Sequence, residues 1–230
     1  SIEMILSIHQ LAYLPWLGYF DRIARSDKFV YLDNVQFERN SFINRNRIKT
    51  PHGPIWLTIP VRLKEHFNKT IADIEIDARQ NWKRKHLRSI EQNYRHAPDF
   101  TKKFNRLAAI YDTDVPRLSD FCFSQLLFWL GELEITTPIL RASALPVIGH
   151  KSELILNLCR HLGAATYLSG SLGRDYLRVE EFSAAGVQVC FHEYVHPQYP
   201  QMHGSFIPAM GIVDYWMNCS EPTMFKAKTP

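Results

Sequence analysis

The sequence has no long apolar run and no strong excess of one charge. No apolar stretch approaches the roughly twenty residues of a membrane-spanning helix, and the first residues lack the basic-then-apolar pattern of a secretory signal. The formal charge is +4, an excess too small to predict nucleic-acid binding by itself, but suited to an anionic small molecule such as a nucleotide or a sugar phosphate. We therefore expect a cytoplasmic protein without membrane insertion.

Patterns typical of metal and redox sites are also missing. The four cysteines lie roughly thirty residues apart, with no C-x-x-C pair and no paired histidine spacing of the zinc type: Cys122, Cys159, Cys190 and Cys219. We expect buried, reduced thiols, and we predict no metal site. No Gly-Lys-Ser/Thr follows the glycine-bearing loop near residue 170, which excludes a Walker-type phosphate loop.

The composition is that of a globular protein. Of 230 residues, 46% are hydrophobic and 22% are charged, which is enough for a sizeable core. We expect one domain over residues 1–230, with a mainly helical insert around residues 82–135.

The first forty-odd residues predict a strand, a loop, a helix and a second strand. Residues 4–8 are almost continuously apolar, as in a strand buried on both faces. Apolar residues then recur at helical spacing from Leu17 to Ala24, and Pro15 suits the first turn of this helix. Charged residues lie between them: Asp21, Arg22 and Arg25. A second apolar run covers residues 29–32, so we predict an α/β fold with a mostly parallel sheet and a Rossmann-like three-layer core.

Polar side chains follow both predicted strands. In an open parallel sheet, ligands bind beyond the carboxyl ends of the strands, so we expect these residues to converge on one rim. The residues are His9, Gln10, Asp33, Asn34 and Gln36. We take His9, Gln10 and Asp33 as candidate catalytic residues, and Gln36 with Tyr13 and Trp16 of the intervening aromatic turn as candidate substrate-binding residues.

Residues 38–53 form a polar connection, which we predict to be a loop. Its guanidinium and amide groups suit phosphate, carboxylate or sugar hydroxyls, although such a loop can also be plain solvated surface. The candidate binding residues here are Asn44, Arg45, Asn46 and Lys49.

Strands are predicted at residues 56–61 and 71–76 with a turn at 64–69 between them, a basic helix from Trp82, and helical structure throughout 98–135. A candidate strand covers residues 136–141.

Ser152 then begins a helix that ends at Gly163, and a short strand leads into a loop with glycines that allow close approach to an anion. The candidate binding residues of this loop are Ser169, Gly170, Gly173, Arg174 and Tyr176. The proline-rich tail could close over a site, and contributes the candidates His196, Tyr199 and Gln201.

Five segments together resemble the WbqC-like family of bacterial proteins, over essentially the whole chain. They are IHQLAYLPWLGYFDRIARSDKFVYLDNVQF, NRNRIKT, WLTIPV, YLSGSLGRDYL and the HPQYPQ...F.P...IVD tail. One departure is Leu11, where the family pattern leads us to expect proline. The resemblance implies a role in the synthesis of O-antigen or other surface polysaccharides (lipopolysaccharide biosynthesis), with a transferase attaching glycine or another amino acid to an amino sugar or a modified base.

The opening unit is also similar to the first part of HIGH-type nucleotidyltransferases, and of pantoate–β-alanine ligases in particular. Those enzymes adenylate a carboxylate and then admit an amine. Here Tyr19 stands where the second histidine of that motif would follow Gly18, and there is no KMSKS-like loop. The likeness therefore implies the fold, and it leaves open whether ATP or a nucleotide-activated substrate is used.

The resulting hypothesis is amide formation by positioning. His9, oriented by Asp33 or Gln10, would act as a base, since an imidazole titrates near neutral pH. The basic connection, with Arg174 opposite, would hold a phosphate or carboxylate, and Gln36 and Gln201 would contact hydroxyls. The expected partners are a nucleotide sugar or other phosphorylated acceptor and an amino acid or acyl donor. Two alternatives are a nucleic-acid modifier that uses basic stretches 39–49 and 83–88, and a glycan-precursor-binding protein without catalysis.

Overall fold

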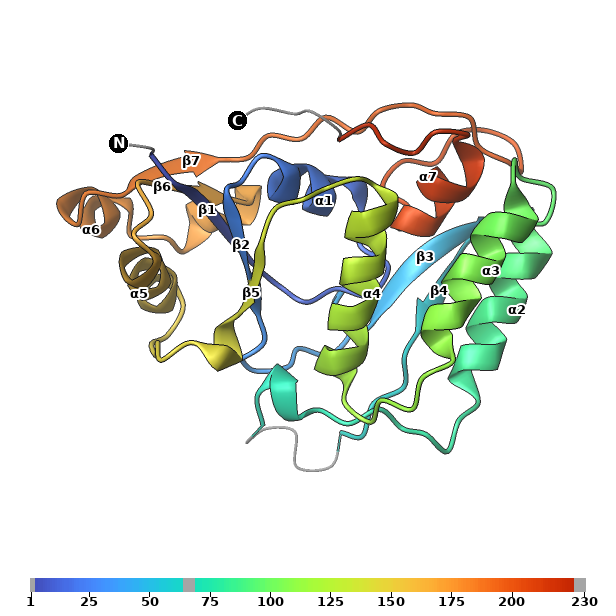
Figure 1. Cartoon of the computed structure of the whole chain (residues 1–230), viewed down its shortest axis with the longest axis horizontal. Coiled ribbons are helices and arrows are strands. Elements are labelled where there is room, and N and C mark those ends of the chain that lie inside the picture. Colours follow the sequence, from blue (N-terminus) through green and yellow to red (C-terminus); the bar gives the residue numbers. More distant parts are fainter. Residues whose placement is uncertain (1–2, 64–68, 226–230) are drawn as a thin grey trace.

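A parallel sheet forms one half of the molecule (Figure 1). The computed structural model describes residues 3–63 and 69–225. The five strands have the order β5-β2-β1-β6-β7, and every adjacent pair is parallel. The strands are β1 (Ile5–Gln10), β2 (Lys28–Leu32), β5 (Ile139–Arg141), β6 (Thr166–Ser169) and β7 (Gln188–Phe191). The α/β fold with a Rossmann-like core, predicted from the opening strand, helix and strand, is confirmed.

The two faces of the sheet belong to different apolar clusters. Along β2, Phe29 and Tyr31 join the cluster that includes α1 (Leu17–Ala24) and α4 (Leu118–Glu132). Val30 and Leu32, which point the other way because side chains alternate along a strand, join the cluster of α5 (Ser152–Leu162) and α6 (Val179–Ala184). The sheet is thus buried on both faces between two helical layers.

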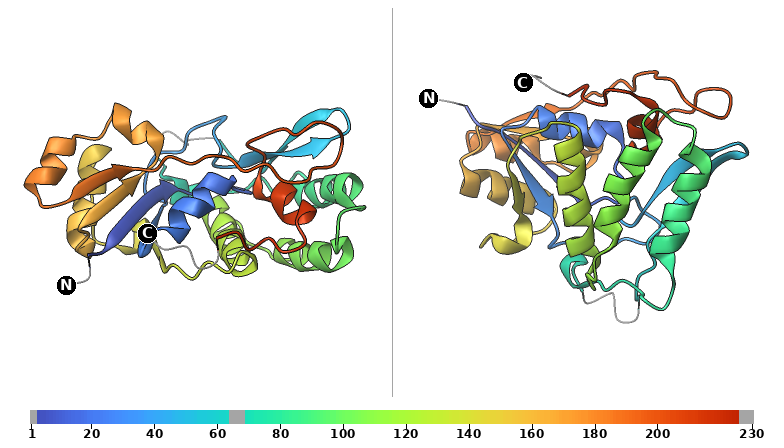
Figure 2. Two further views of the ribbon diagram at one scale, coloured as in Figure 1. Left: turned by 90° about the horizontal axis from the view of Figure 1, so that it is seen from above. Right: turned by 45° about the vertical axis from the view of Figure 1, so that its right-hand side comes forward.

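The other half of the molecule is helical. It contains α2 (Trp82–Tyr94), α3 (Phe100–Tyr111) and α4, with the antiparallel hairpin of β3 (Arg45–Thr50) and β4 (Gly53–Thr58) beside them (Figure 2). The segment after β7 crosses from the sheet to this half and ends in α7 (Ile212–Asn218) (Figures 1 and 2). Among residues 3–63 and 69–225, no helix combines the length and apolar character needed to cross a bilayer.

Three local predictions were wrong. Much of the predicted loop over residues 38–53 is strand β3, which pairs with β4. Residues 71–73 form the short 3-10 helix η2 instead of a strand. Helical structure is interrupted between α3 and α4, at residues 112–117. The turn predicted at 64–69 falls mostly outside the described residues. At residues 71–73 the alternation of polar and apolar residues was outweighed by hydrogen bonds to a distant segment, from the Ile71 and Ala72 amides to the carbonyls of Val35 and Asp33.

A buried hydrogen-bonded chain joins the loop after β1 to the helical half. The hydroxyl of Tyr13 contacts that of Tyr111 and lies 2.8 Å from His86 Nδ1, and His86 Nε2 lies 3.0 Å from the carbonyl of Thr58. Burial lowers the pKa of His86 from 6.5 to about 4, although the Thr58 carbonyl acts in the opposite direction. His86 is therefore neutral in the folded protein well below neutral pH.

This lowered pKa predicts loss of stability in acid. Between pH 6.5 and about 4 the unfolded chain binds a proton at His86 that the folded chain does not, so the free energy of unfolding falls as the pH falls. His86 should account for up to about 3 kcal/mol of this fall. Urea denaturation at a series of pH values should give a shallower pH dependence for His86→Gln than for the wild type. The exposed His52→Gln variant should keep the wild-type slope, and an equal slope for His86→Gln would contradict the prediction.

Candidate functional site

The sheet order places a topological switch between β1 and β6. From β1 the chain moves outward to β2 and β5, and then returns to the other side of β1 to form β6 and β7. In open α/β sheets the crevice outside the carboxyl ends of the strands at such a point is where ligands bind. Here β1 ends at Gln10 and β6 ends at Ser169, so the candidate site lies beside these two ends.

His9 lies at this point and is held by its neighbours. Its Nδ1 lies 3.0 Å from the carbonyl of Gln10, and its ring packs edge-on against Trp16 and Tyr19, with centroids 5.6 and 5.2 Å away. A carbonyl can only accept, so Nδ1 carries the hydrogen and Nε2 has the free lone pair. Gln10 orients His9 as predicted, through its main chain.

The predicted titration of His9 near neutral pH is wrong. Burial and, to a lesser extent, the positive charge of Arg22 lower the pKa of His9 from 6.5 to about 3, although the bond to the Gln10 carbonyl acts in the opposite direction. His9 is therefore a neutral imidazole at physiological pH. It can accept a hydrogen bond at Nε2 but is a weak base.

Arg22 is the charged residue of this site that was not predicted from the sequence. It belongs to α1, is only 4% exposed, and donates from Nη2 to the Ile8 carbonyl at 3.1 Å. In the described part of the chain no carboxylate lies within ion-pair distance of it, and burial lowers its pKa. The groups that act electrostatically on Arg22 are tyrosine hydroxyls instead of carboxylates. Among these hydroxyls, those of Tyr167 and Tyr19 have the largest effect on its pKa, which they raise. A buried cation without a counter-charge is costly, and such groups concentrate at functional sites.

The loop after β6 is shaped around Arg22. A Cβ on Gly170 would lie 2.6 Å from Arg22 Nη1, and a Cβ on Gly173 would lie 2.0 Å from Ser169 Oγ. Ser169 itself is buried and donates to the Gly170 carbonyl at 2.8 Å. The groups packed closely against these glycines are therefore the guanidinium of Arg22 at Gly170 and the hydroxyl of Ser169 at Gly173, and the expected approach of an anion to the loop stays a prediction.

Arg174 does not supply the counter-charge expected of it. Its Nη2 lies 3.2 Å from Glu193 Oε1 in an exposed ion pair, and its guanidinium covers the ring of Phe191 at 4.4 Å. Tyr176 is 44% exposed, and the charge of Arg22 acts on its hydroxyl, so Tyr176 does border the site.

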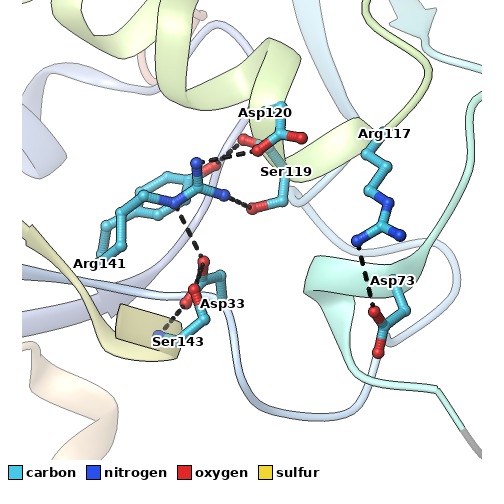
Figure 3. Close-up of polar contacts among 8 residues, drawn as sticks. Asp33, Asp73, Arg117, Ser119, Asp120, Arg141 and Ser143 are labelled. Carbon is cyan, nitrogen blue, oxygen red and sulfur yellow. Dashed lines mark hydrogen bonds and ion pairs between the residues drawn. The ribbon is translucent and has the colours of Figure 1, made fainter. Parts of the chain in front are cut away.

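Asp33 does not orient His9, which corrects the prediction. It is fully buried, and its two oxygens accept hydrogen bonds from the Ser143 amide at 2.7 Å and hydroxyl at 2.6 Å (Figure 3). Arg141 Nε lies 3.2 Å from the same carboxylate and its guanidinium also contacts Asp120 and Ser119 (Figure 3). Asp33 thus links the end of β2 to the segment that follows β5, and both of its carboxylate oxygens already accept hydrogen bonds.

All four residues expected to hold an anion in the polar connection donate to the protein's own backbone, and Arg45 Nη2 does so to the Asn40 carbonyl at 2.8 Å. Asn44 donates to the Ile59 carbonyl at 2.9 Å, and Asn46 donates to the Leu14 carbonyl at 2.8 Å. Lys49 is 1% exposed and donates to the carbonyl of Ser205 at 2.6 Å. These side chains were mistaken for ligand-binding groups because sequence alone does not reveal that carbonyls of distant segments lie beside them.

The proline-rich tail is attached to the helical half by buried hydrogen bonds. Asp214 is fully buried and accepts hydrogen bonds from Tyr94, Tyr199 and the Gln201 amide, each at 2.7 Å. Gln201 Oε1 in turn accepts from Lys49 at 3.0 Å. Tyr199 and Gln201 therefore have structural partners, and their predicted role in contacting substrate has no support in these contacts.

The remaining candidates divide between the two halves. Tyr13 lies in the buried chain with His86, so its predicted substrate contact is wrong, and exposed Gln36 pairs through its backbone with Thr70. Trp16 lies against His9. His196 packs edge-on against Tyr194, with ring centroids 5.2 Å apart. Tyr194 in turn lies against α1, because a Cβ on Gly18 would be 3.1 Å from its Cδ1 atom.

The site that the structure brings together is therefore smaller than predicted. It contains a neutral imidazole, an uncompensated guanidinium, a tight loop and two aromatic rings: His9, Arg22, residues 169–173, Trp16 and Tyr19. Such a set can bind an anion at Arg22 and accept a hydrogen bond at His9. Among the residues described, no group of three His, Cys, Asp or Glu side chains is placed to hold a metal ion.

Comparison with known proteins gives one family. Residues 10–225 match the model of the WbqC-like protein family. The chain is 34% identical over 218 residues to the uncharacterized protein Rv1507c of Mycobacterium tuberculosis, covering 93% of each chain. No solved structure matches significantly.

Proposed function

Because this chain belongs to the WbqC-like protein family, we propose that it is a transferase that attaches an amino acid such as glycine to an amino sugar of a surface-polysaccharide precursor. The observation that carries a ligand-binding role is the buried, uncompensated Arg22 beside His9 at the topological switch. The amino acid and the amino sugar come from the family resemblance of the sequence motifs.

Amide formation needs an activated acyl group, and we propose an acyl donor with a phosphate leaving group. The amine nitrogen attacks the carbonyl carbon, the new C–N bond forms, and the bond to the phosphate oxygen breaks. Arg22 stabilises the negative charge that collects on the departing phosphate. His9 accepts a hydrogen bond from the amine at Nε2, and the amine proton passes from there to solvent. Whether the phosphate comes from ATP or from a preactivated donor is part of the test.

The test is product formation from a panel. The purified protein is incubated with nucleotide-linked amino sugars and either glycine with ATP or preactivated glycyl adenylate without ATP, and the mixture is analysed by mass spectrometry. We expect a product heavier than the acceptor by one glycine residue. His9→Ala should lower kcat by about tenfold, the value of one hydrogen bond made in the transition state.

Other results would overturn this proposal. Binding of nucleotide sugars without product, across the panel, would favour a glycan-precursor-binding protein. Affinity for DNA or RNA that falls steeply with salt would favour a nucleic-acid modifier. Full turnover by His9→Ala would remove His9 from the mechanism.

A further inference from the structure

A cluster of exposed aromatic rings lies on and beside the β3–β4 hairpin. Phe42 is 43% exposed and Trp56 is 42% exposed, with their ring centroids 5.6 Å apart. Large aromatic side chains normally bury most of their surface, so two adjacent exposed rings mark a surface that can bind a ligand. We call these two rings, with Trp16, the aromatic platform.

The aromatic platform continues into the candidate site. Trp16 connects Phe42 to His9, because its ring centroid lies 5.6 Å from the centroid of each of these two rings. Each of these contacts is edge-on, which leaves parts of the ring faces uncovered by their neighbours. One extended ligand could therefore contact both His9 and the platform.

The platform is strongly basic. Arg45 and Arg47 alternate along β3 and share the face of the hairpin on which Trp56 lies, since Trp56 pairs with Arg47. The Arg45 guanidinium lies 4.0 Å from the centroid of the Trp56 ring, and that of Arg47 lies 5.4 Å away. The sequence from residue 39 to residue 63 contains no Asp or Glu, so no acidic side chain of this segment neutralises them.

Both arginines also have unused donors. The Nε atoms of Arg45 and Arg47 are buried, and neither finds an acceptor within the described residues. Buried donors are normally paired, so these two are exceptions that need an explanation. The Nη2 atoms of Arg45 and Arg47 donate to the carbonyls of Asn40 and Ala209, at 2.8 and 3.2 Å, so an anionic ligand on the hairpin would bind the remaining Nη atoms of the two guanidinium groups.

We propose that the aromatic platform binds the base of a nucleotide, whose phosphates extend toward Arg22. Aromatic rings with adjacent arginines favour a planar ring joined to an anion, and they distinguish it from a neutral glycan. The proposal deepens the proposed function, because it makes the activated substrate a nucleotide derivative bound across the β1 end and the hairpin. It concerns binding alone and is tested without turnover.

The test is calorimetric titration with UDP and ADP, with inorganic pyrophosphate as the probe that lacks a base, and with a single-stranded oligonucleotide and a neutral oligosaccharide as the other ligand classes. We expect both nucleotides to bind more tightly than pyrophosphate. Trp56→Ala should weaken nucleotide binding by about tenfold or more, as expected for loss of one stacked base, and leave pyrophosphate binding unchanged. Phe42→Ala should act in the same direction. Leu127→Ala, at a residue of α4 that is 49% exposed, should leave all affinities unchanged.

Several outcomes would overturn the inference. Equal affinity for UDP, ADP and pyrophosphate would show that no base is recognised. An unchanged nucleotide affinity in both platform variants would separate the rings from the ligand. A loss in Trp56→Ala confined to a single-stranded oligonucleotide or to a neutral oligosaccharide would assign the surface to another ligand class. If no product forms but Trp56→Ala still weakens UDP binding, the proposed transfer reaction fails and the base site stands.

Discussion

Replacing Arg22 with methionine should weaken pyrophosphate and UDP binding by about 100-fold and reduce turnover at least as much. This corresponds to about 3 kcal/mol, the upper range for a charge-assisted hydrogen bond to a buried group. Methionine preserves most of the length and apolar stem of the side chain, so packing against Gly170 and the sheet should be kept. Calorimetry with each ligand measures the change.

The stability of Arg22→Met separates a functional role from a structural one. Burial lowers the pKa of Arg22, which means that the protein disfavours its charged form. Replacement loses the bond to the Ile8 carbonyl but removes an unpaired buried charge. We therefore expect the ligand-free melting temperature to stay the same or to rise, as for other residues kept at a cost in stability for function.

Arg174→Met is the matched control, because it removes the same group from the loop that borders the site. Arg174 is exposed and paired with Glu193, so its loss should change neither ligand affinity nor stability appreciably. If Arg174→Met weakened pyrophosphate binding as much as Arg22→Met, the anion would lie at the outer face of the loop. A large drop in melting temperature for Arg22→Met without ligand would make Arg22 a structural residue.

The elements of the sheet could be predicted because their signals are local. The apolar run at residues 4–8 and the helical spacing from Leu17 to Ala24 each reflect burial of one short segment, and both elements lie where they were expected. The position of Gly163 at the end of α5, with a positive φ of 71°, followed from the conformational freedom of glycine.

The same local reasoning could not identify Arg22 as a residue of the candidate site. A charged residue between the apolar positions of an amphipathic helix is normally on the solvent side, and periodicity cannot show that β6 and its loop pass over that side of α1. Gly170 was the available signal, because a glycine at a strand end suggests close approach of another group. Which group approaches depends on the sheet order, and the sheet order is not encoded in either segment alone.

The polar residues of the connection and the tail were misassigned for a related reason. Lys49 and Gln201 are 152 residues apart, and each was interpreted as reaching for a substrate. In the folded chain they contact each other. A cluster of polar residues predicts that hydrogen bonds will be made, but only the tertiary structure shows whether the partner is a ligand or another part of the protein.

Replacing Asp214 with alanine should lower the free energy of unfolding by about 3–5 kcal/mol, the usual cost of removing one member of a buried charged network. The carboxylate accepts from Tyr94, Tyr199 and Gln201. In the variant both tyrosine hydroxyls would lose this acceptor, whereas the Gln201 amide would keep the Ile207 carbonyl at 2.8 Å. Burial raises the pKa of Asp214, but these hydrogen bonds and the charge of Lys49 act against that rise and hold the group in place. Urea denaturation of the wild type and the variant measures the difference.

The control is Asp73→Ala, which removes an aspartate that is 53% exposed and paired with Arg117 at 3.6 Å (Figure 3). An exposed pair of this kind contributes at most about 1 kcal/mol, so the two aspartates should differ severalfold in effect. The same denaturation series with Tyr199→Phe and the double variant tests the contact itself, because the two losses should sum to more than the loss in the double variant. A loss below about 1 kcal/mol for Asp214→Ala would mean that the tail is held to α2 and β3 by its apolar contacts, and that the buried carboxylate has another role.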